Sequence, residues 1–148
     1  MELSWSNTFR YKSFDLSIFM RGAFGHYIYN NMKSSIGHLG AAASTNVLIS
    51  AYDEPIRDAG GIVCSYFLEK GDFWKLENIT LGYNFKPKPN KYFDNLRLYV
   101  SARNIVTITG YSGNDPSLFD TTGLYPGIDG TGVYPQAAVF TIGMKVCF

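Results

Sequence analysis

The stretch from Ala137 to Phe148 (AAVFTIGMKVCF) alternates apolar with small or polar side chains and ends on an aromatic residue. Because successive side chains of a strand point to opposite faces, this stretch predicts a strand with one apolar row. The apolar row consists of Ala138, Phe140, Ile142, Met144, Val146 and Phe148. A soluble β-sandwich would accept this pattern, but its termini usually fray. A transmembrane barrel instead needs its final strand to pair, so that no edge is left in lipid.

Four earlier segments show the same alternation, at residues 3–11, 14–22, 73–85 and 95–107, and the final strand covers 137–148. In the third segment the apolar row is Ile79, Leu81, Tyr83 and Phe85. The opposite faces of the strands are small or polar and carry the charged residues Asp15, Arg21, Arg97, Arg103 and Lys145. A polar row of this kind is expected on the wall of a water-filled lumen.

The connections between these strands are alternately short and long. Lys12 and Ser13 form the first short turn, and the proline-containing stretch 86–90 forms the second. The long connections are 23–72 and 109–135. Within the first, residues 46–52 predict one or two helical turns capped by Thr45 or Asn46. The sequence therefore predicts an all-β fold: five antiparallel strands of a transmembrane β-barrel, with long extracellular loops and short periplasmic turns.

Composition excludes several other classes of protein. The chain has 148 residues and a formal net charge of +1, which disfavours nucleic acid as a partner. No run of 18 apolar residues is present, so a transmembrane helix is not expected. The 11 Tyr, 11 Phe and 2 Trp exceed what a core of this size needs. Such rings form interfacial belts in barrels or stack on sugars, and a secreted carbohydrate-binding β-sandwich is therefore the alternative.

The sequence predicts no catalytic residue, cofactor or metal, and so no enzyme. His26 and His38 lack the spacing of a metal motif, and Gly110-Tyr111-Ser112-Gly113 is not a nucleophile elbow. Asp115, Asp120 and Asp129 could offer oxygens to calcium, but aspartate before proline or glycine is more often turn chemistry. Cys64 and Cys147 are expected as two unpaired thiols, because the barrel separates them by the membrane thickness.

Three groups of motifs resemble SusC/RagA-type TonB-linked outer-membrane transporters. The first is Tyr66 to Tyr83 (YFLEKGDFWKLENITLGY) and the second is Leu98 to Pro116. The third comprises the closing stretches Gly127 to Asp129, Tyr134 to Gln136 and Phe140 to Gly143. They stand in the family's order, and Phe14 to Asn30 is also similar. The departures are Trp74-Lys75, where the family usually has an aliphatic residue and Arg, and Cys147 near the end.

This resemblance implies a barrel of about 22 strands in the outer membrane of a Bacteroidetes-type bacterium. Such a barrel imports glycans or peptides, is capped by a SusD-like lipoprotein, and is energised through TonB-ExbB-ExbD. It implies that this chain supplies the last five strands, and that the plug domain and the TonB box lie outside it, at the N-terminal end. The partners expected are then outer-membrane lipid, the lipoprotein, TonB-ExbB-ExbD, the barrel assembly machinery, and an oligosaccharide or peptide substrate.

Two sets of residues are candidates for function. Phe148, with Val146, Met144 and Phe140 behind it, resembles a C-terminal signal for the barrel assembly machinery, although all four could simply be lipid-facing anchors. In the loop 109–135, Tyr111, Tyr125 and Tyr134 could stack on a substrate or pack against the lipoprotein, and Asp115 and Asp129 could accept hydrogen bonds from hydroxyl groups. The alternative is that these loop residues only fix the conformation of the loop.

Overall fold

A computed structural model of the chain describes residues 1–57, 63–85, 94–117, 127–130, 132, 134 and 136–147. The chain forms two compact units, which we describe separately. The sheet unit consists of Glu2–Ala23, Trp74–Ile108 and Gln136–Phe148. The loop unit consists of Met1, Phe24–Phe73 and Thr109–Pro135, so the two long connections gather into one unit.

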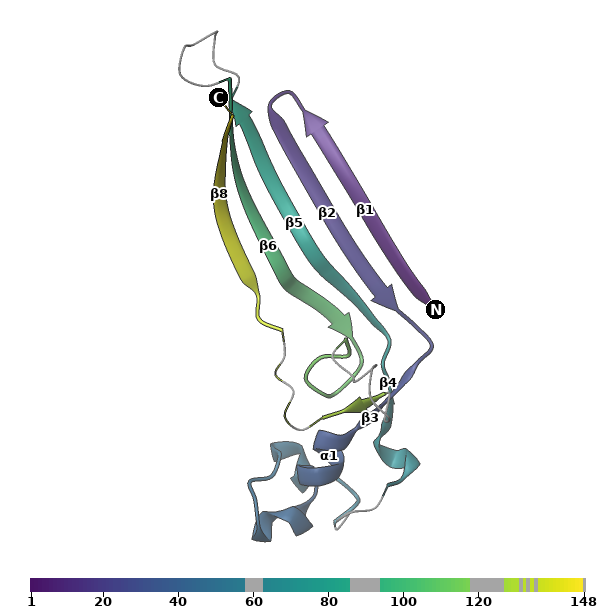
Figure 1. Cartoon of the computed structure of the whole chain (residues 1–148). Helices are drawn as coiled ribbons and strands as arrows, with labels where there is room; N and C mark the ends of the chain where they lie inside the picture. Colours follow the sequence, from purple (N-terminus) through teal and green to yellow (C-terminus); the bar gives the residue numbers. More distant parts are fainter. Residues whose placement is uncertain are drawn as a thin grey trace. The chain divides into compact units, whose positions relative to one another are not determined.

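The sheet unit is one five-stranded antiparallel sheet (Figure 1). Its strands are β1 (Glu2–Tyr11), β2 (Phe14–Ala23), β5 (Phe73–Phe85), β6 (Asn95–Thr109) and β8 (Val139–Cys147), in the order β1-β2-β5-β6-β8. The alternation therefore located every strand of this sheet, with ends that differ by at most two residues within the described part of the chain. The predicted turn at 86–90 and Phe148 lie outside the described residues.

The pairing register sorts the side chains of the sheet into one apolar and one polar face. Trp5 lies opposite Met20 and Phe9 opposite Leu16, while Arg10 lies opposite Asp15 on the other face. At the other edge of the sheet, apolar pairs alternate with polar or small ones. The apolar pairs are Leu96–Val146, Leu98–Met144, Val100–Ile142 and Ala102–Phe140, and the others include Arg97–Lys145 and Ser101–Thr141. The two rows predicted for the terminal strand are those of β8.

A two-residue turn joins β1 and β2, because Tyr11 pairs with Phe14. Its first residue, Lys12, has a φ of 54°, in the left-handed region that two-residue hairpins require. The backbone N–H of Asn84 donates to the Ser13 carbonyl at 2.8 Å, which attaches the end of β5 to this turn. The short turn is therefore held by the pairing of β1 with β2 and by a hydrogen bond from β5.

Two strands depart from strict alternation. In β6, Asn104 has a φ of 54° and its side-chain amide donates to the Ala137 carbonyl at 3.4 Å. In β5, Glu77 meets Arg21 whereas Gly82 lies against Asp15, and both partners are on the polar face of β2. Five positions separate Glu77 from Gly82, so alternation alone would place them on opposite faces. The strand therefore contains a bulge-like irregularity between them.

The loop unit is built on a small mixed sheet. Strand β3 (Tyr27–Asn30) pairs antiparallel with β4 (Leu68–Lys70) and parallel with β7 (Ile128–Asp129). Ile28 and Phe67 are buried, and Phe67 makes edge-to-face contacts with Tyr29 and Tyr66. This packing gives the two long connections a core of their own.

The described part of the loop unit also contains four short helices: α1 (Asn31–Ile36) and the 3-10 helices η1 (Leu39–Ala43), η2 (Ile49–Tyr52) and η3 (Ser65–Phe67). The helical turn expected within 46–52 is η2, but the cap predicted at Thr45 or Asn46 is wrong. The N-cap residue of η2 is Leu48, whose side chain has no hydrogen-bond acceptor. Thr45 still belongs to the preceding turn, where its N–H donates to the Ala41 carbonyl. None of the helices in the described part of the chain combines the length and apolarity needed to cross a membrane.

Candidate functional site

The polar face of the sheet carries an ion pair that spans three strands. Arg97 on β6 donates through Nε to Oδ1 of Asp15 on β2 at 3.2 Å, and Asn84 on β5 donates to the same oxygen at 2.7 Å. A Cβ atom at Gly82 on β5 would lie 2.6 Å from Asp15 Oδ1 and 2.8 Å from Arg97 Nε. The glycine therefore leaves the space through which Arg97 crosses β5.

A hollow of about 600 Å³ lies on this face beside the β1–β2 turn. Its lining includes three cationic side chains, Arg10, Lys12 and Arg97, and one carboxylate, Asp15. Further along the same face Arg21 forms an ion pair with Glu77 at 2.9 Å. The polar face is thus a charged surface organised by cross-strand pairs, as predicted for residues that line water.

The opposite face of the sheet exposes large apolar side chains. Val100 is 49% exposed, Phe140 71% and Ile142 84%. Trp5, Phe9, Leu81 and Leu98 are also exposed on this face. A water-soluble protein seldom presents so continuous an apolar surface. Combined with a charged opposite face, it is typical of the wall of a transmembrane β-barrel.

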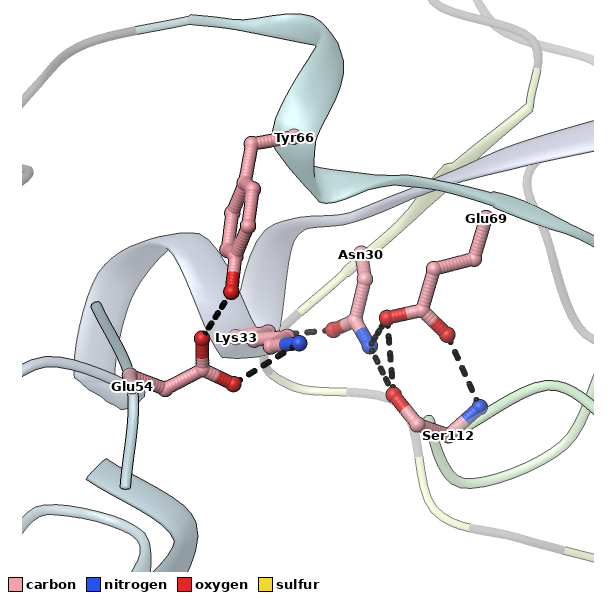
Figure 2. A network of polar contacts seen from close by, with 6 residues as sticks. All are labelled: Asn30, Lys33, Glu54, Tyr66, Glu69 and Ser112. Carbon is pink, nitrogen blue, oxygen red and sulfur yellow. Dashed lines mark hydrogen bonds and ion pairs between the residues drawn. The ribbon is translucent and has the colours of Figure 1, made fainter. Parts of the chain in front are cut away.

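In the loop unit a polar cluster joins four separate segments of the chain (Figure 2). Glu69 on β4 accepts hydrogen bonds from the Ser112 hydroxyl at 2.8 Å and from the Ser112 backbone N–H at 2.9 Å. Asn30 donates to Ser112 Oγ at 3.1 Å and to Glu69 at 3.3 Å, and its carbonyl oxygen accepts from the Lys33 backbone N–H at 2.9 Å. Asn30 thus caps α1 and connects this helix to Glu69 on β4 and to Ser112 in the segment after β6.

The second half of this cluster is an ion pair. Lys33 lies 2.8 Å from Glu54, and the Tyr66 hydroxyl donates to the other carboxylate oxygen of Glu54 (Figure 2). The Lys33 ammonium also lies 5.2 Å from the centre of the Tyr66 ring. The hydrogen bonds from Lys33 and Tyr66 hold the pKa of the Glu54 carboxyl below its ordinary value, and the same Glu54 contact raises the pKa of Tyr66.

A cavity of about 270 Å³ opens beside this cluster. Polar side chains on its wall include Lys33, Ser50, Glu54 and Ser112, and Met32 and Leu48 supply apolar surface. The wall residues come from α1, from η2 with its flanking residues, and from the segment after β6. The cavity therefore exists only because the two long connections fold together.

Three of the predicted loop residues are buried in the loop unit. The Tyr111 hydroxyl donates to Asp129 at 2.8 Å, and both side chains are buried. Burial, together with the Asp129 carboxylate, raises the pKa of Tyr111. Asp115 accepts from the Ser117 N–H at 2.9 Å and from the Ser117 hydroxyl at 2.6 Å. These contacts favour the alternative in which the residues fix the loop.

The remaining predicted residues are differently placed. Tyr134 is 90% exposed, so its contact with a substrate or partner stays a prediction. Tyr125 and Phe148 lie outside the described residues. Phe140, Met144 and Val146 share the apolar face of β8, which fits either an assembly signal or a lipid anchor.

The described residues contain no group of three His, Cys, Asp or Glu side chains that could hold a metal ion. Cys64 and Cys147 are both free thiols. Sequence patterns did not predict the cluster formed by Asn30, Lys33, Glu54, Tyr66, Glu69 and Ser112. One feature of this cluster is visible locally in the sequence: asparagine is a preferred N-cap residue, and Asn30 directly precedes α1. Members of the cluster lie up to 82 residues apart in the sequence, as Asn30 and Ser112 do, and only the fold brings them together.

The sheet thus defines this chain as a wall segment of a transmembrane β-barrel, and comparison with known proteins narrows the class. The chain is 29% identical over 167 residues to TonB-dependent receptor P3 of Formosa agariphila, a match that covers 99% of this chain and 16% of the relative. It is 28% identical over 148 residues to TonB-dependent receptor SusC of Bacteroides thetaiotaomicron, covering 94% of this chain and 14% of SusC. No family model matches the chain.

Solved structures agree on the fold. The RagAB peptide importer in its "open-open" state matches 99% of this chain and 17% of its own, with a TM-score of 0.75 and 20% identity. Its "closed-closed" state gives a TM-score of 0.64 and 19% identity over 95% of this chain. The resemblance to SusC/RagA-type transporters is therefore confirmed, and these relatives are receptors and transporters rather than enzymes. The chain spans about a sixth of the length of the curated relatives it matches.

Proposed function

We propose that this chain forms part of the barrel of a TonB-dependent transporter in the outer membrane of a Bacteroidetes-type bacterium. One observation carries the proposal: an exposed apolar face runs across the sheet, opposite a face organised by ion pairs. The similarity to TonB-dependent receptors over 94–99% of the chain supports it. The edge strands β1 and β8 would pair with further strands of the barrel, because lipid tolerates no open edge.

In this proposal the loop unit is extracellular and the β1–β2 turn is periplasmic. The substrate is a glycan or a peptide, a SusD-like lipoprotein covers the loops, and TonB-ExbB-ExbD supplies the energy. The similarity to the RagAB peptide importer supports a peptide as substrate, and the glycan is what the resemblance of the sequence motifs implies. Among the described residues predicted to touch a substrate or the lipoprotein, Tyr134 is 90% exposed, which supports it as a contact residue in this proposal.

Uptake by cells that carry the full-length protein tests this function. We expect uptake of the natural glycan or peptide to be lost when the gene for the transporter or for TonB is deleted. Tyr134→Ala should reduce uptake without changing the abundance of the barrel, because the ring is exposed and supports no core. Unchanged uptake in the TonB deletion would contradict the proposal, and a parallel fall in uptake and abundance would give Tyr134 a purely structural role.

We also propose that the row of Phe140, Met144, Val146 and Phe148 is read by the barrel assembly machinery. Deletion of Phe148 from the full-length protein should strongly reduce the heat-modifiable barrel in outer-membrane fractions. Phe9→Ala is the matched control, because it removes an exposed aromatic ring from the apolar face of the sheet but lies outside the terminal row. Normal insertion after deletion of Phe148 would show that these residues are only lipid anchors.

A further inference from the structure

The hollow beside the β1–β2 turn has an excess of positive charge. Among its described lining residues, Arg10, Lys12 and Arg97 are cationic and Asp15 is anionic. Asp15 is already engaged, because both of its carboxylate oxygens accept hydrogen bonds from Arg97, and Oδ1 also accepts one from Asn84. This carboxylate therefore neutralises Arg97 and leaves Arg10 and Lys12 without an ion-pair partner among the described residues.

Of these two cations, Arg10 has the greater hydrogen-bonding capacity to spare. It lies opposite Asp15 in the β1–β2 pairing, but within the described residues its guanidinium makes no hydrogen bond. Lys12 differs, since its ammonium lies 5.3 Å from the centre of the Tyr11 ring. A guanidinium has five N–H donors, so Arg10 can bind a further group in the hollow without breaking a contact that the sheet already makes.

The charge and the size of the hollow select a class of ligand. A guanidinium binds a carboxylate through two parallel hydrogen bonds, and Thr8, Ser13 and Ser17 add uncharged polar residues to the lining. At about 600 Å³ the hollow lies within the range of roughly 300–1,000 Å³ that holds a drug-sized molecule, so it is far larger than a free anion needs. The hollow therefore suits a carboxylate that a larger molecule carries.

A polypeptide segment suits this hollow better than a lipid does. Phe14 is the one apolar residue among the described residues of the lining. The large exposed side chains that would meet acyl chains, such as Phe9 and Val100, are on the opposite face of the sheet. Two of the three cations in the lining are arginines, and protein–protein contacts are enriched in arginine and depleted in lysine. The observations thus favour an acidic protein side chain over a lipid phosphate.

We propose that this hollow binds an aspartate or glutamate side chain of a polypeptide segment that lies against the polar face, and that Arg10 pairs with its carboxylate. The inference rests on the proposed function in one respect, that the polar face lines a water-filled lumen. It goes beyond that function by assigning a contact inside the lumen to a named residue, and by stating the charge of the group that makes it.

The test uses the full-length protein in intact cells, with the photo-cross-linking residue p-benzoylphenylalanine in place of Thr8, an uncharged residue of the lining. We expect irradiation to join this position to one polypeptide segment that contains aspartate or glutamate, identified by mass spectrometry of the purified protein. Arg10→Glu should lower the yield about five-fold or more, because loss of an exposed ion pair alone accounts for up to about that factor. Replacing the captured acidic residue by lysine in the Arg10→Glu protein should restore the yield.

Arg103→Glu is the matched control, because it reverses an exposed cation of the polar row outside the lining and should leave the yield unchanged. Arg10→Gln only removes the charge, so it replaces Arg10→Glu if that barrel fails to insert, and should lower the yield by a smaller factor.

Four results would overturn the inference: no cross-linked polypeptide, a captured segment without an acidic residue, cross-links only to lipid or sugar, or an unchanged yield in the Arg10 variants. A heat-modifiable barrel that still depends on TonB for uptake would leave the proposed transport function intact in each of these cases.

Discussion

At the scale of single residues, Gly82 is the position on which the polar face of the sheet depends most directly. Gly82→Ala would put a methyl group 2.6–2.8 Å from Asp15 and Arg97, so the ion pair that crosses β5 has to move. Because the displaced atoms belong to side chains that can swing aside, we expect a cost at the low end of the range for overpacking, about 1 kcal/mol. We expect a lower urea midpoint for the folded barrel in lipid vesicles.

Gly110→Ala is the control for this substitution, since no atom lies within 4 Å of the added methyl group. It should leave the urea midpoint unchanged. Equal effects of the two substitutions would mean that the Asp15–Arg97 pair does not occupy the space above Gly82.

A second residue-scale prediction concerns the Glu54 carboxyl, which lies outside the strands. Its folded pKa is lowered below the ordinary 4.5 by Lys33 and then by Tyr66, so it stabilises the loop unit above pH 4.5. That contribution is lost as the pH falls through the folded pKa. We expect amide protection in α1 and η2, corrected for intrinsic exchange rates, to fall when the pH is lowered from about 6 to about 3.

Glu54→Gln provides the comparison, because its amide does not titrate. Its protection should already be reduced at neutral pH and should change little on acidification. At the alkaline end, the raised Tyr66 pKa means that its contribution is present below pH 10 and lost as the pH rises through the folded value. If amide protection fell equally on acidification in the wild type and in Glu54→Gln, the Glu54 carboxylate would not stabilise the loop unit.

The residue scale also shows a limit of sequence reasoning. Tyr111, Asp115 and Asp129 were singled out because tyrosines and aspartates in a loop can meet a ligand, yet Tyr111 and Asp129 bond to each other and Asp115 bonds to Ser117. The sequence cannot separate these possibilities, because both need the same residue types. The residues that Asp129 contacts are determined only when β7 pairs with β3 in the folded protein.

At the scale of secondary-structure elements, the two faces of the strands should differ in their tolerance of charge. Val100→Arg places a cation on the apolar face opposite Ile142, and should cost about 2–4 kcal/mol at mid-membrane. Ser101→Arg, one residue further along β6, joins the polar row opposite Thr141 and should fold nearly as well as the wild type. The heat-modifiable fraction in outer-membrane preparations measures both. If Val100→Arg and Ser101→Arg reduced the heat-modifiable fraction equally, the sheet would be buried on both faces.

Strands were the most predictable elements because a period of two needs only local residue types. The irregularities in them were not predictable. Asn104 adopts a positive φ within β6, and β5 shifts its facing between Glu77 and Gly82, because pairing with neighbouring strands decides where a bulge forms. The short elements β3, β4 and β7 were missed for the same reason. With four, three and two residues, they carry no period of their own and exist by pairing with one another.

At the scale of the whole molecule, the alternation of short and long connections predicts a direction for the chain in the membrane, with the long connections on the extracellular side. The two long connections gather into one compact unit with its own core and polar cluster, although Trp74–Ile108 separates them in the sequence. The sequence predicted their length and polarity, but neither their joint folding nor the cavity between them. Both depend on contacts between residues far apart in the chain, such as Asn30 and Ser112.

The central claim, a sheet that spans the outer membrane with its long connections outside, is tested most directly by cysteine labelling in intact cells. In full-length protein carrying Cys64→Ser and Cys147→Ser, Tyr134→Cys marks the exposed loop and Lys12→Cys marks the exposed β1–β2 turn. We predict that a membrane-impermeant maleimide labels Tyr134→Cys in intact cells, and labels Lys12→Cys only after the outer membrane is permeabilised. Equal labelling of both in intact cells, or the reverse pattern, would contradict the account.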